Sequence, residues 1–112
     1  MKRELLFRCW DGKKMLKHHE INFSWLQAGD FGDWEVMQFT GLLDKNKVRI
    51  YEGDILMWIK TKKPKGKKLY YPVFFSEKGE WRIHDKGTDR RLCDVTNHEV
   101  IGNIYENKDL LK

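Results

Sequence analysis

Hydrophobic positions in this chain come in short runs that are separated by turn-forming residues. Residues 55–59 place apolar side chains on both faces of an extended backbone, and this predicts a strand that is covered on both sides. In residues 81–84, apolar and polar side chains alternate, which is typical of a half-buried antiparallel strand. Similar runs predict further strands at residues 5–10, 34–40, 48–51, 69–76, 92–95 and 99–105.

Glycine and aspartate mark where the chain is expected to turn. Asp11 and Gly12 predict a hairpin, because glycine accepts a positive φ and aspartate tolerates one. The segment that follows, residues 15–23, fits either a short helix or a returning strand. Residues 27–33 and 85–91 are polar and are expected to be loops.

Three single residues have specific expected roles in the backbone. Pro72 predicts a sheet edge or a bulge, because proline cannot donate to a strand ladder. Gly102 predicts a bulge or a close approach of two backbone segments. Asn107 is expected to cap the last helical turn with its side-chain carbonyl.

The expected fold is therefore mainly β, a small barrel-like antiparallel sheet with a short C-terminal helical turn. About seven short strands with frequent turns are typical of such a sheet. Residues 54–105 alone could close as a five-element, SH3-like barrel. A length of 112 residues favours a single domain, 1–112, which buries roughly two-thirds of the surface of the unfolded chain.

The composition is that of a folded protein without a disulfide framework. It is 40% hydrophobic and 13% aromatic, and disordered chains lack this aromatic content. Only Cys9 and Cys93 are present, and two buried thiols suit a reducing compartment better than one disulfide. No apolar run approaches the roughly 20 residues of a membrane span, and the charged residues 1–8 do not resemble a signal peptide. We therefore expect a cytoplasmic protein without a membrane partner.

Positive charge is concentrated in residues 60–68, which hold six lysines and no acid, whereas the whole chain carries +5. Such a loop could replace counterions along a phosphate backbone and bind nucleic acid weakly, with Tyr70 and Tyr71 stacking on bases. The alternative is a solvated loop whose charges prevent sheets from pairing edge to edge. We favour this alternative, because lysine lacks the bidentate geometry of arginine. The candidate nucleic-acid-binding residues are Lys60, Lys62, Lys63, Lys65, Lys67 and Lys68.

Residues 51–54, with the sequence Tyr-Glu-Gly-Asp, offer the clearest candidate chemistry. Glu52 and Asp54 would share one face of a strand and could act as paired carboxylates. The alternative is a turn in which Asp54 accepts backbone N–H bonds before the apolar run that follows. We favour the turn.

Histidine and cysteine residues form no recognisable zinc motif or nucleophilic site. Zinc sites show paired ligands with spacings such as C-x₂-C, and adjacent His18 and His19 would point to opposite faces of a strand. Cys9 lies in an aromatic run that favours burial and a raised pKa. Cys93 and His98 are close only in sequence. We therefore expect no metal, no cofactor and no catalytic residue.

Three segments, residues 7–11, 37–55 and 99–111, carry motifs that resemble those of a known family, the YopX-like proteins of phages and prophages. Residues 7–11 are similar to the opening F-R-x-W-D of that family, and residues 37–55 are similar to its segment Q-(Y/F)-T-G-L-x-D followed by I-Y-E-G-D-I. Residues 99–111 resemble its ending V-I-G-N-I-Y-E-N, with two leucines behind. Because order and spacing also agree, the sequence is identified as a member of this family.

The resemblance implies a phage-associated, mainly-β protein and suggests self-association, but it implies no established activity. Lys47 stands where the family usually has glycine, so Asn46 is expected to take the left-handed conformation. Lys108 replaces a proline that usually opens the last helical turn. The matching residues with expected structural roles are Gly41, Tyr51, Glu52, Gly53, Asp54, Gly102 and Asn103.

The function that these observations favour is a non-enzymatic interaction module that binds another protein or forms a homo-oligomer. Weak, non-specific nucleic-acid binding through residues 60–68 is the alternative. An enzyme is the least favoured class, because the sequence displays no convergent set of polar residues.

Overall fold

The structure, a computed structural model, describes residues 4–21, 24, 32, 34–59, 68–85 and 88–111. Within these ranges the chain forms nine strands and three short 3₁₀ helices. No helix in the described ranges is both long and apolar enough to cross a membrane. The chain divides into two compact units, residues 1–39 and 40–112, and most of the loop expected at 27–33 lies outside the described residues.

The first unit is built around strand β1, which pairs antiparallel with β2 on one side and with the start of β3 on the other. A buried cluster of Cys9, Leu16 and Ile21 forms its core, against which Trp34 packs. Its elements are β1 (Phe7–Trp10), β2 (Met15–Leu16), the 3₁₀ helix η1 (His18–Glu20) and the first part of β3 (Glu35–Leu43).

The hairpin expected at Asp11 and Gly12 joins β1 to β2. Asp11 Oδ1 accepts the backbone N–H groups of Lys13 and Lys14 at 2.8 and 2.9 Å, and Gly12 has a φ of 99°. The segment that fitted either a strand or a helix contains both, a two-residue strand followed by one 3₁₀ turn.

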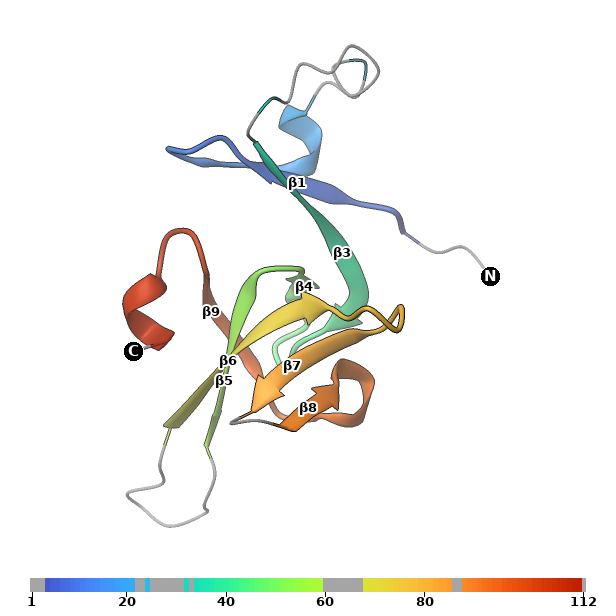
Figure 1. The fold of residues 1–112 in the computed structure, drawn as a ribbon, viewed down its shortest axis with the longest axis vertical. Coiled ribbons are helices and arrows are strands. Elements are labelled where there is room, and N and C mark those ends of the chain that lie inside the picture. The colour runs from blue at the N-terminus through green and yellow to red at the C-terminus, as the bar shows by residue number, and fades with distance from the viewer. Residues whose placement is uncertain are drawn as a thin grey trace. The chain divides into compact units, whose positions relative to one another are not determined.

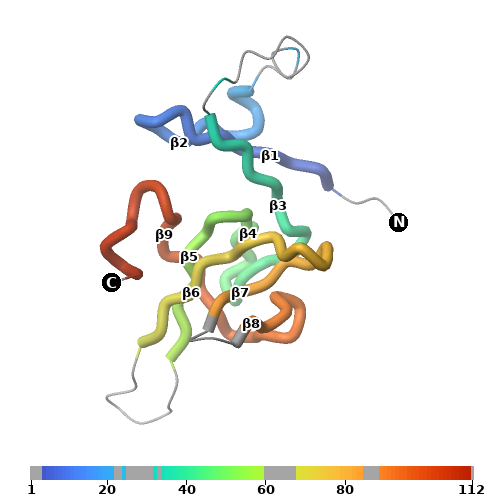
Figure 2. Tube along the Cα trace, in the orientation of Figure 1, coloured from blue at the N-terminus to red at the C-terminus, as the bar shows by residue number. Residues whose placement is uncertain are grey.

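The second unit contains a curled five-stranded antiparallel sheet with the strand order β8-β7-β6-β5-β9 (Figure 1). The end of β3 pairs with β4 (Arg49–Tyr51), and the tube in Figure 2 follows the chain from there into the sheet. The remaining elements are β5 (Asp54–Ile59), β6 (Lys68–Phe75), β7 (Trp81–Asp85), β8 (Thr88–Arg91), η2 (Leu92–Asp94), β9 (Glu99–Asn103) and η3 (Lys108–Leu111).

The core of the second unit lies on one face of this sheet. Leu56 and Ile55, on opposite faces of β5, are both fully buried, so the prediction of a strand covered on both sides holds where β5 begins. The side chains are less buried at the end of β5, where Ile59 is 46% exposed. The prediction of a mainly-β fold with a short C-terminal helical turn is confirmed. The buried core cluster consists of Ile50, Leu56, Tyr71, Val73, Ile83 and Leu92.

Two predicted elements are wrong. The loop expected at 85–91 contains strand β8, whose charged residues hide the strand signal because β8 is the sheet edge and charged edges prevent further pairing. The strand expected at 92–95 is the 3₁₀ helix η2, in which only Leu92 is buried. A four-residue apolar pattern does not distinguish these two conformations.

Three predictions about single residues are also wrong. Lys47, and not Asn46, takes the left-handed conformation, with a φ of 64°. The side chain of Asn107 does not cap the last helical turn; its Oδ1 accepts the backbone N–H of Asn103 at 3.1 Å. The expectation of a sheet edge or a bulge at Pro72 is wrong as well, because β6 is a central strand and its register with β5 is continuous at Pro72. Pairing of β6 with β7 begins only at Val73, so the proline interrupts no ladder bond to β7.

Candidate functional site

The segment Tyr51–Asp54 is a tight turn between β4 and β5. Asp54 is 2% exposed, and its Oδ2 accepts the backbone N–H of Tyr51 at 2.7 Å. Gly53, with a φ of 85°, donates its N–H to Val73 O and accepts from Ile104 N, both at 2.9 Å. The turn therefore ties β4, β5, β6 and the end of β9 together, while Glu52 lies half-buried within it.

Asn103 organises the turn that follows β9. Its Oδ1 accepts the backbone N–H groups of Tyr105 and Glu106 at 3.0 and 2.9 Å, and its Nδ2 donates to the Glu106 carboxylate at 2.9 Å. Just before it, a Cβ atom on Gly102 would lie 2.4 Å from Asn107 Oδ1. The pairing of β5 with β9 also shifts register at this point. Only glycine fits here without displacing Asn107.

Asp44 is a third backbone anchor, which the sequence analysis did not identify. Its Oδ1 accepts the N–H groups of Asn46 and Val48 at 2.8 and 2.9 Å, and its Oδ2 accepts that of Val100 at 2.9 Å. The spacing Asp-x-Asn in a turn is a signal for the first of these bonds. Val100, however, lies 56 positions away, so no local pattern shows that bond.

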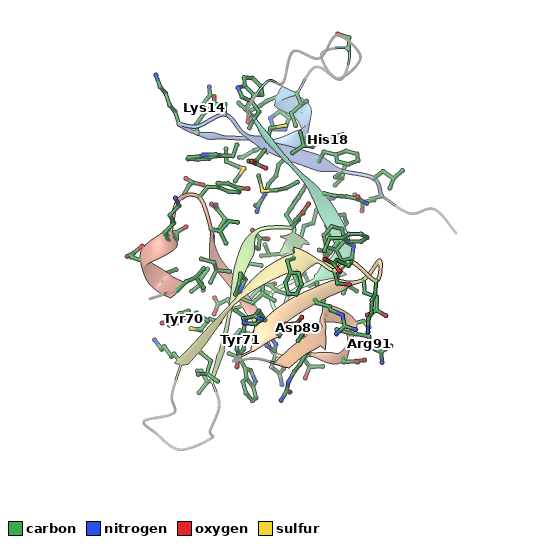
Figure 3. The ribbon with its side chains drawn as sticks, in the orientation of Figure 1. Lys14, His18, Tyr70, Tyr71, Asp89 and Arg91 are labelled. Carbon is green, nitrogen blue, oxygen red and sulfur yellow. The ribbon has the colours of Figure 1, made fainter. Side chains whose placement is uncertain are left out.

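Most of the lysine-rich segment lies outside the described residues, namely Lys60, Lys62, Lys63, Lys65 and Lys67. Lys68 is described; it begins β6 opposite Ile59 and is exposed. The two tyrosines beyond it differ, because Tyr71 is 6% exposed in the core whereas Tyr70 is half-buried on the other face of β6 (Figure 3). Tyr71 is therefore not available as an open stacking platform.

The histidine and cysteine candidates are spread over both units. His18 Nδ1 accepts the backbone N–H of Phe7 at 2.9 Å, and His84 Nδ1 lies 2.8 Å from the Asp89 carboxylate. In the described ranges no group of three or more potential ligands is placed to hold a metal ion. The prediction of two buried thiols is correct for Cys9, where burial raises the pKa, and wrong for Cys93, which is exposed.

A small cavity of about 160 Å³ opens beside His98 in the second unit. Tyr71, Ile83 and Val95 contribute apolar surface, and Trp58 lines the cavity with its ring parallel to the imidazole of His98 within 10°. The ring centroids of Trp58 and His98 are 6.0 Å apart, and those of Tyr71 and His98 are 6.1 Å apart. The polar lining residues are Arg90, Asp94, Thr96 and His98.

His98 is held in a single orientation in this cavity. The residue is 7% exposed, and its Nδ1 lies 2.8 Å from the carbonyl oxygen of Thr96. A carbonyl can only accept, so Nδ1 carries a proton and donates it. In the neutral ring, Nε2 is then an acceptor. Within the described part of the chain, no group hydrogen-bonds to that Nε2.

An exposed aromatic surface lies at the hairpin between β6 and β7. Phe75 is 52% exposed, although it lies in a regular strand and contacts Trp81 edge to face with the ring centroids 4.7 Å apart. Phe74 lies on the opposite face of the same strand. We call this region the Phe75 surface; its groove is lined by Phe74, Phe75, Ser76, Glu77, Lys78, Arg82 and Asp89.

Comparison with known proteins places the chain in a family. The family model described as YopX protein matches residues 10–112. The chain belongs to the YopX family. A solved structure, protein EF1440 from Enterococcus faecalis, is similar to it with 26% identity and a TM-score of 0.72, over 99% of this chain and all of that one. The search of curated proteins found no match.

The YopX match covers every one of the three backbone anchors. Asp44, the Tyr51–Asp54 turn and Asn103 all fall within it, and each fixes loop backbone around the curled sheet. The opening motif is only partly included, because the match begins at Trp10, the last residue of β1. The segments that carry the family resemblance are thus segments that shape the backbone.

We expect the stability of this YopX chain to fall with acidification because of His98. Burial lowers the pKa of His98 below its ordinary 6.5; nearby Arg90 adds to this, and the bond to Thr96 O opposes it. The unfolded state therefore binds the proton more tightly, so stability is lost as the pH falls below about 6.5. Urea unfolding at intervals between pH 8 and pH 5 measures this, and His98→Gln should show a shallower slope. A slope that is identical in the two proteins would contradict the assignment.

Proposed function

We propose that this chain is a non-enzymatic interaction module that associates with a second copy of itself through the Phe75 surface. The observation that carries the proposal is the exposure of Phe75. Half of a large apolar ring faces solvent, yet its strand and its contact with Trp81 hold it in place. Rigid aromatic side chains of this kind supply much of the energy at protein interfaces. The proposal includes the phage association and the cytoplasmic location that the sequence suggested.

The charges around Phe75 favour a second copy as the partner. Glu77 and Lys78 are neighbours on the hairpin turn beside Phe75, and Arg82 and Asp89 line the groove on the Phe74 face of the same hairpin. A two-fold contact brings the same patch of two copies together, so a patch with both signs can place each charge opposite its complement. Arg82 is already oriented, because Glu80 accepts from its guanidinium at 2.7 Å.

Association through edge strand β8 is less favourable than association through this surface. Edge strand β8 carries Asp89, Arg90 and Arg91, which are exposed. Figure 3 labels Asp89 and Arg91 on this strand. Charged residues on an edge prevent pairing with another strand. The side chains of the hairpin are therefore the better contact.

The use of the buried polar groups supports a non-enzymatic role. Asp44, Asp54 and Asn103 each accept bonds from backbone N–H groups, and Nδ1 of His98 donates to a backbone carbonyl. Carboxylates that are committed to backbone groups in this way are poorly placed to exchange protons with a substrate.

Light scattering after size exclusion tests the proposal. Wild-type protein should show a mass that rises with concentration to at least that of a dimer. Phe75→Ser should weaken the association at least about 30-fold, because removing a central aromatic from an interface costs about 2 kcal/mol or more. Leu43→Ser is the matched control, since Leu43 is also 52% exposed in the second unit.

A monomer at every concentration would contradict the proposal, as would equal association of the two variants. Thermal unfolding of both variants shows whether they are folded. We expect both to be folded, because each substitution replaces a side chain that is already half in solvent.

A further inference from the structure

The cavity beside His98 has features of a ligand site that self-association does not use. We propose that it binds a pyrimidine base. Its volume of about 160 Å³ is the first argument. An apolar cavity of roughly 150 Å³ accommodates benzene, so this one suits a single six-membered ring and is small for the two fused rings of a purine.

The apolar lining suits the faces of such a ring. Val95 is half-buried and offers accessible apolar surface, whereas Tyr71 and Ile83, which are 6% and 1% exposed, contribute only a small part of it. Trp58 is half-buried and also lines the cavity, and a base stacked on an aromatic side chain gains about 1–3 kcal/mol. A flat ring can contact these surfaces, whereas a branched aliphatic group of equal volume gains no stacking.

The polar lining suits the edge of a pyrimidine. Nε2 of neutral His98 is an acceptor for a ring N–H or an amino group. Arg90 offers only donors, which match the ring carbonyl oxygens of a pyrimidine. The carboxylate of Asp94 is a second acceptor in the lining; it already accepts from Arg91 Nε at 2.8 Å, which orients it.

The positive charge of Arg90 argues against a cation as the ligand. The aromatic rings alone would also suit an ammonium group. Arg90, however, is close enough to His98 to lower the pKa of the imidazole, so a cation in the cavity would face the same repulsion. A neutral ring with both donors and acceptors is not repelled by Arg90.

The pyrimidine could belong to a free nucleoside or to single-stranded nucleic acid, and a titration separates the two. We would add uridine, cytidine and adenosine to ¹⁵N-labelled protein and follow the Trp58 indole N–H and the His98 ring nitrogens by NMR. Uridine or cytidine should bind at least about tenfold more tightly than adenosine, because an extra ring exceeds the pocket. Repeating the titration with oligo-dT and oligo-dA identifies the source: a large gain for oligo-dT over uridine, with the same shifts, indicates a single strand.

Two variants test the assignment of residues. Arg90→Gln should weaken pyrimidine binding about tenfold or more, because it removes a charged hydrogen-bond donor. Arg49→Gln, which removes another exposed arginine of the same unit, should leave binding unchanged. His98→Phe should abolish binding while keeping a ring in place. If that variant fails to fold, the comparison of Arg90→Gln with Arg49→Gln still decides the question.

Three results would overturn the proposal. They are equal affinity for pyrimidines and purines, equal effects of the two arginine variants, and the absence of shifts at Trp58 and His98 at millimolar nucleoside. Equal binding of oligo-dT and oligo-dA without these shifts would assign the interaction to the lysine-rich segment instead. None of these results affects the light-scattering experiment, so the proposal of self-association is tested independently.

Discussion

The Asp44→Ala variant is expected to lose about 3 kcal/mol of unfolding free energy, the largest effect of any single substitution considered for this chain. The carboxylate is 8% exposed and accepts three backbone N–H groups, those of Asn46, Val48 and Val100. Removing it leaves three backbone donors without their acceptor. Because one of the three is 56 residues distant, both the local turn and the attachment of β9 should weaken.

Urea unfolding followed by circular dichroism measures this loss. Asp109→Ala, which removes an exposed aspartate from η3, is the matched control and should change stability by less than about 0.5 kcal/mol. Asp44→Asn should lie between wild type and Asp44→Ala, because it keeps one acceptor oxygen. A loss below about 1 kcal/mol in Asp44→Ala would mean that these bonds do not hold the second unit together.

Acid should remove the stabilisation by the Asp44 carboxylate from the wild-type protein. Burial alone would raise the pKa of Asp44, but the bonds from Val100, Val48 and Asn46, together with Lys45, lower it below the ordinary 3.8. The stabilisation is therefore complete above about pH 4 and is lost as the pH falls through the lower pKa of the folded state. This pH range lies below the range in which His98 affects stability. The Asp44→Ala variant should not show the loss of stability in this range.

The Gly102→Ala variant is expected to lose about 2–3 kcal/mol. The added Cβ would lie 2.4 Å from Asn107 Oδ1 and 2.6 Å from its Cγ, so the asparagine side chain must move. Moving it breaks the bond from Asn103 N to Asn107 Oδ1, and it disturbs the turn in which Asn103 binds Tyr105 and Glu106.

A double-mutant cycle isolates this contact. In an Asn107→Ala background the obstructing oxygen is absent, so Gly102→Ala should cost less than about 1 kcal/mol. The coupling between the two positions would then account for most of the loss. An equal cost in both backgrounds would show that Gly102 is required for another reason.

Local signals in the sequence predict much of the sheet. Asp11 and Gly12 mark the first hairpin, and residues 55–59 carry the pattern of a strand that is covered on both sides. Strand β8 escapes prediction because its residues, Thr88–Arg91, are polar and their strand conformation comes from pairing with β7. Pairing with a neighbour, which no local pattern encodes, decides that conformation.

The candidate cavity is less predictable than the turns. The turn at Asp54 follows from its own segment, because the acceptor and the donor are three residues apart. Trp58, Tyr71 and His98 come from β5, β6 and the loop before β9, and they meet only through the registers of those strands. A single sequence does not give the register between distant strands. From the sequence, His98 could be related only to Cys93, which is close to it along the chain, and not to Trp58 and Tyr71, whose rings lie near it in the fold.

Binding of a second copy through the Phe75 surface, on the scaffold that the shared motifs build, is the proposal on which the function of this YopX chain rests. Intermolecular paramagnetic relaxation tests it most directly. A nitroxide would be attached to Lys78→Cys in a Cys93→Ser background, and this protein would be mixed with ¹⁵N-labelled wild type. We expect broadening of the amide signals of the ¹⁵N-labelled chain in the β6–β7 hairpin, around Phe75 and Trp81. Unbroadened hairpin signals at concentrations where light scattering shows association, or no association at all, would contradict it.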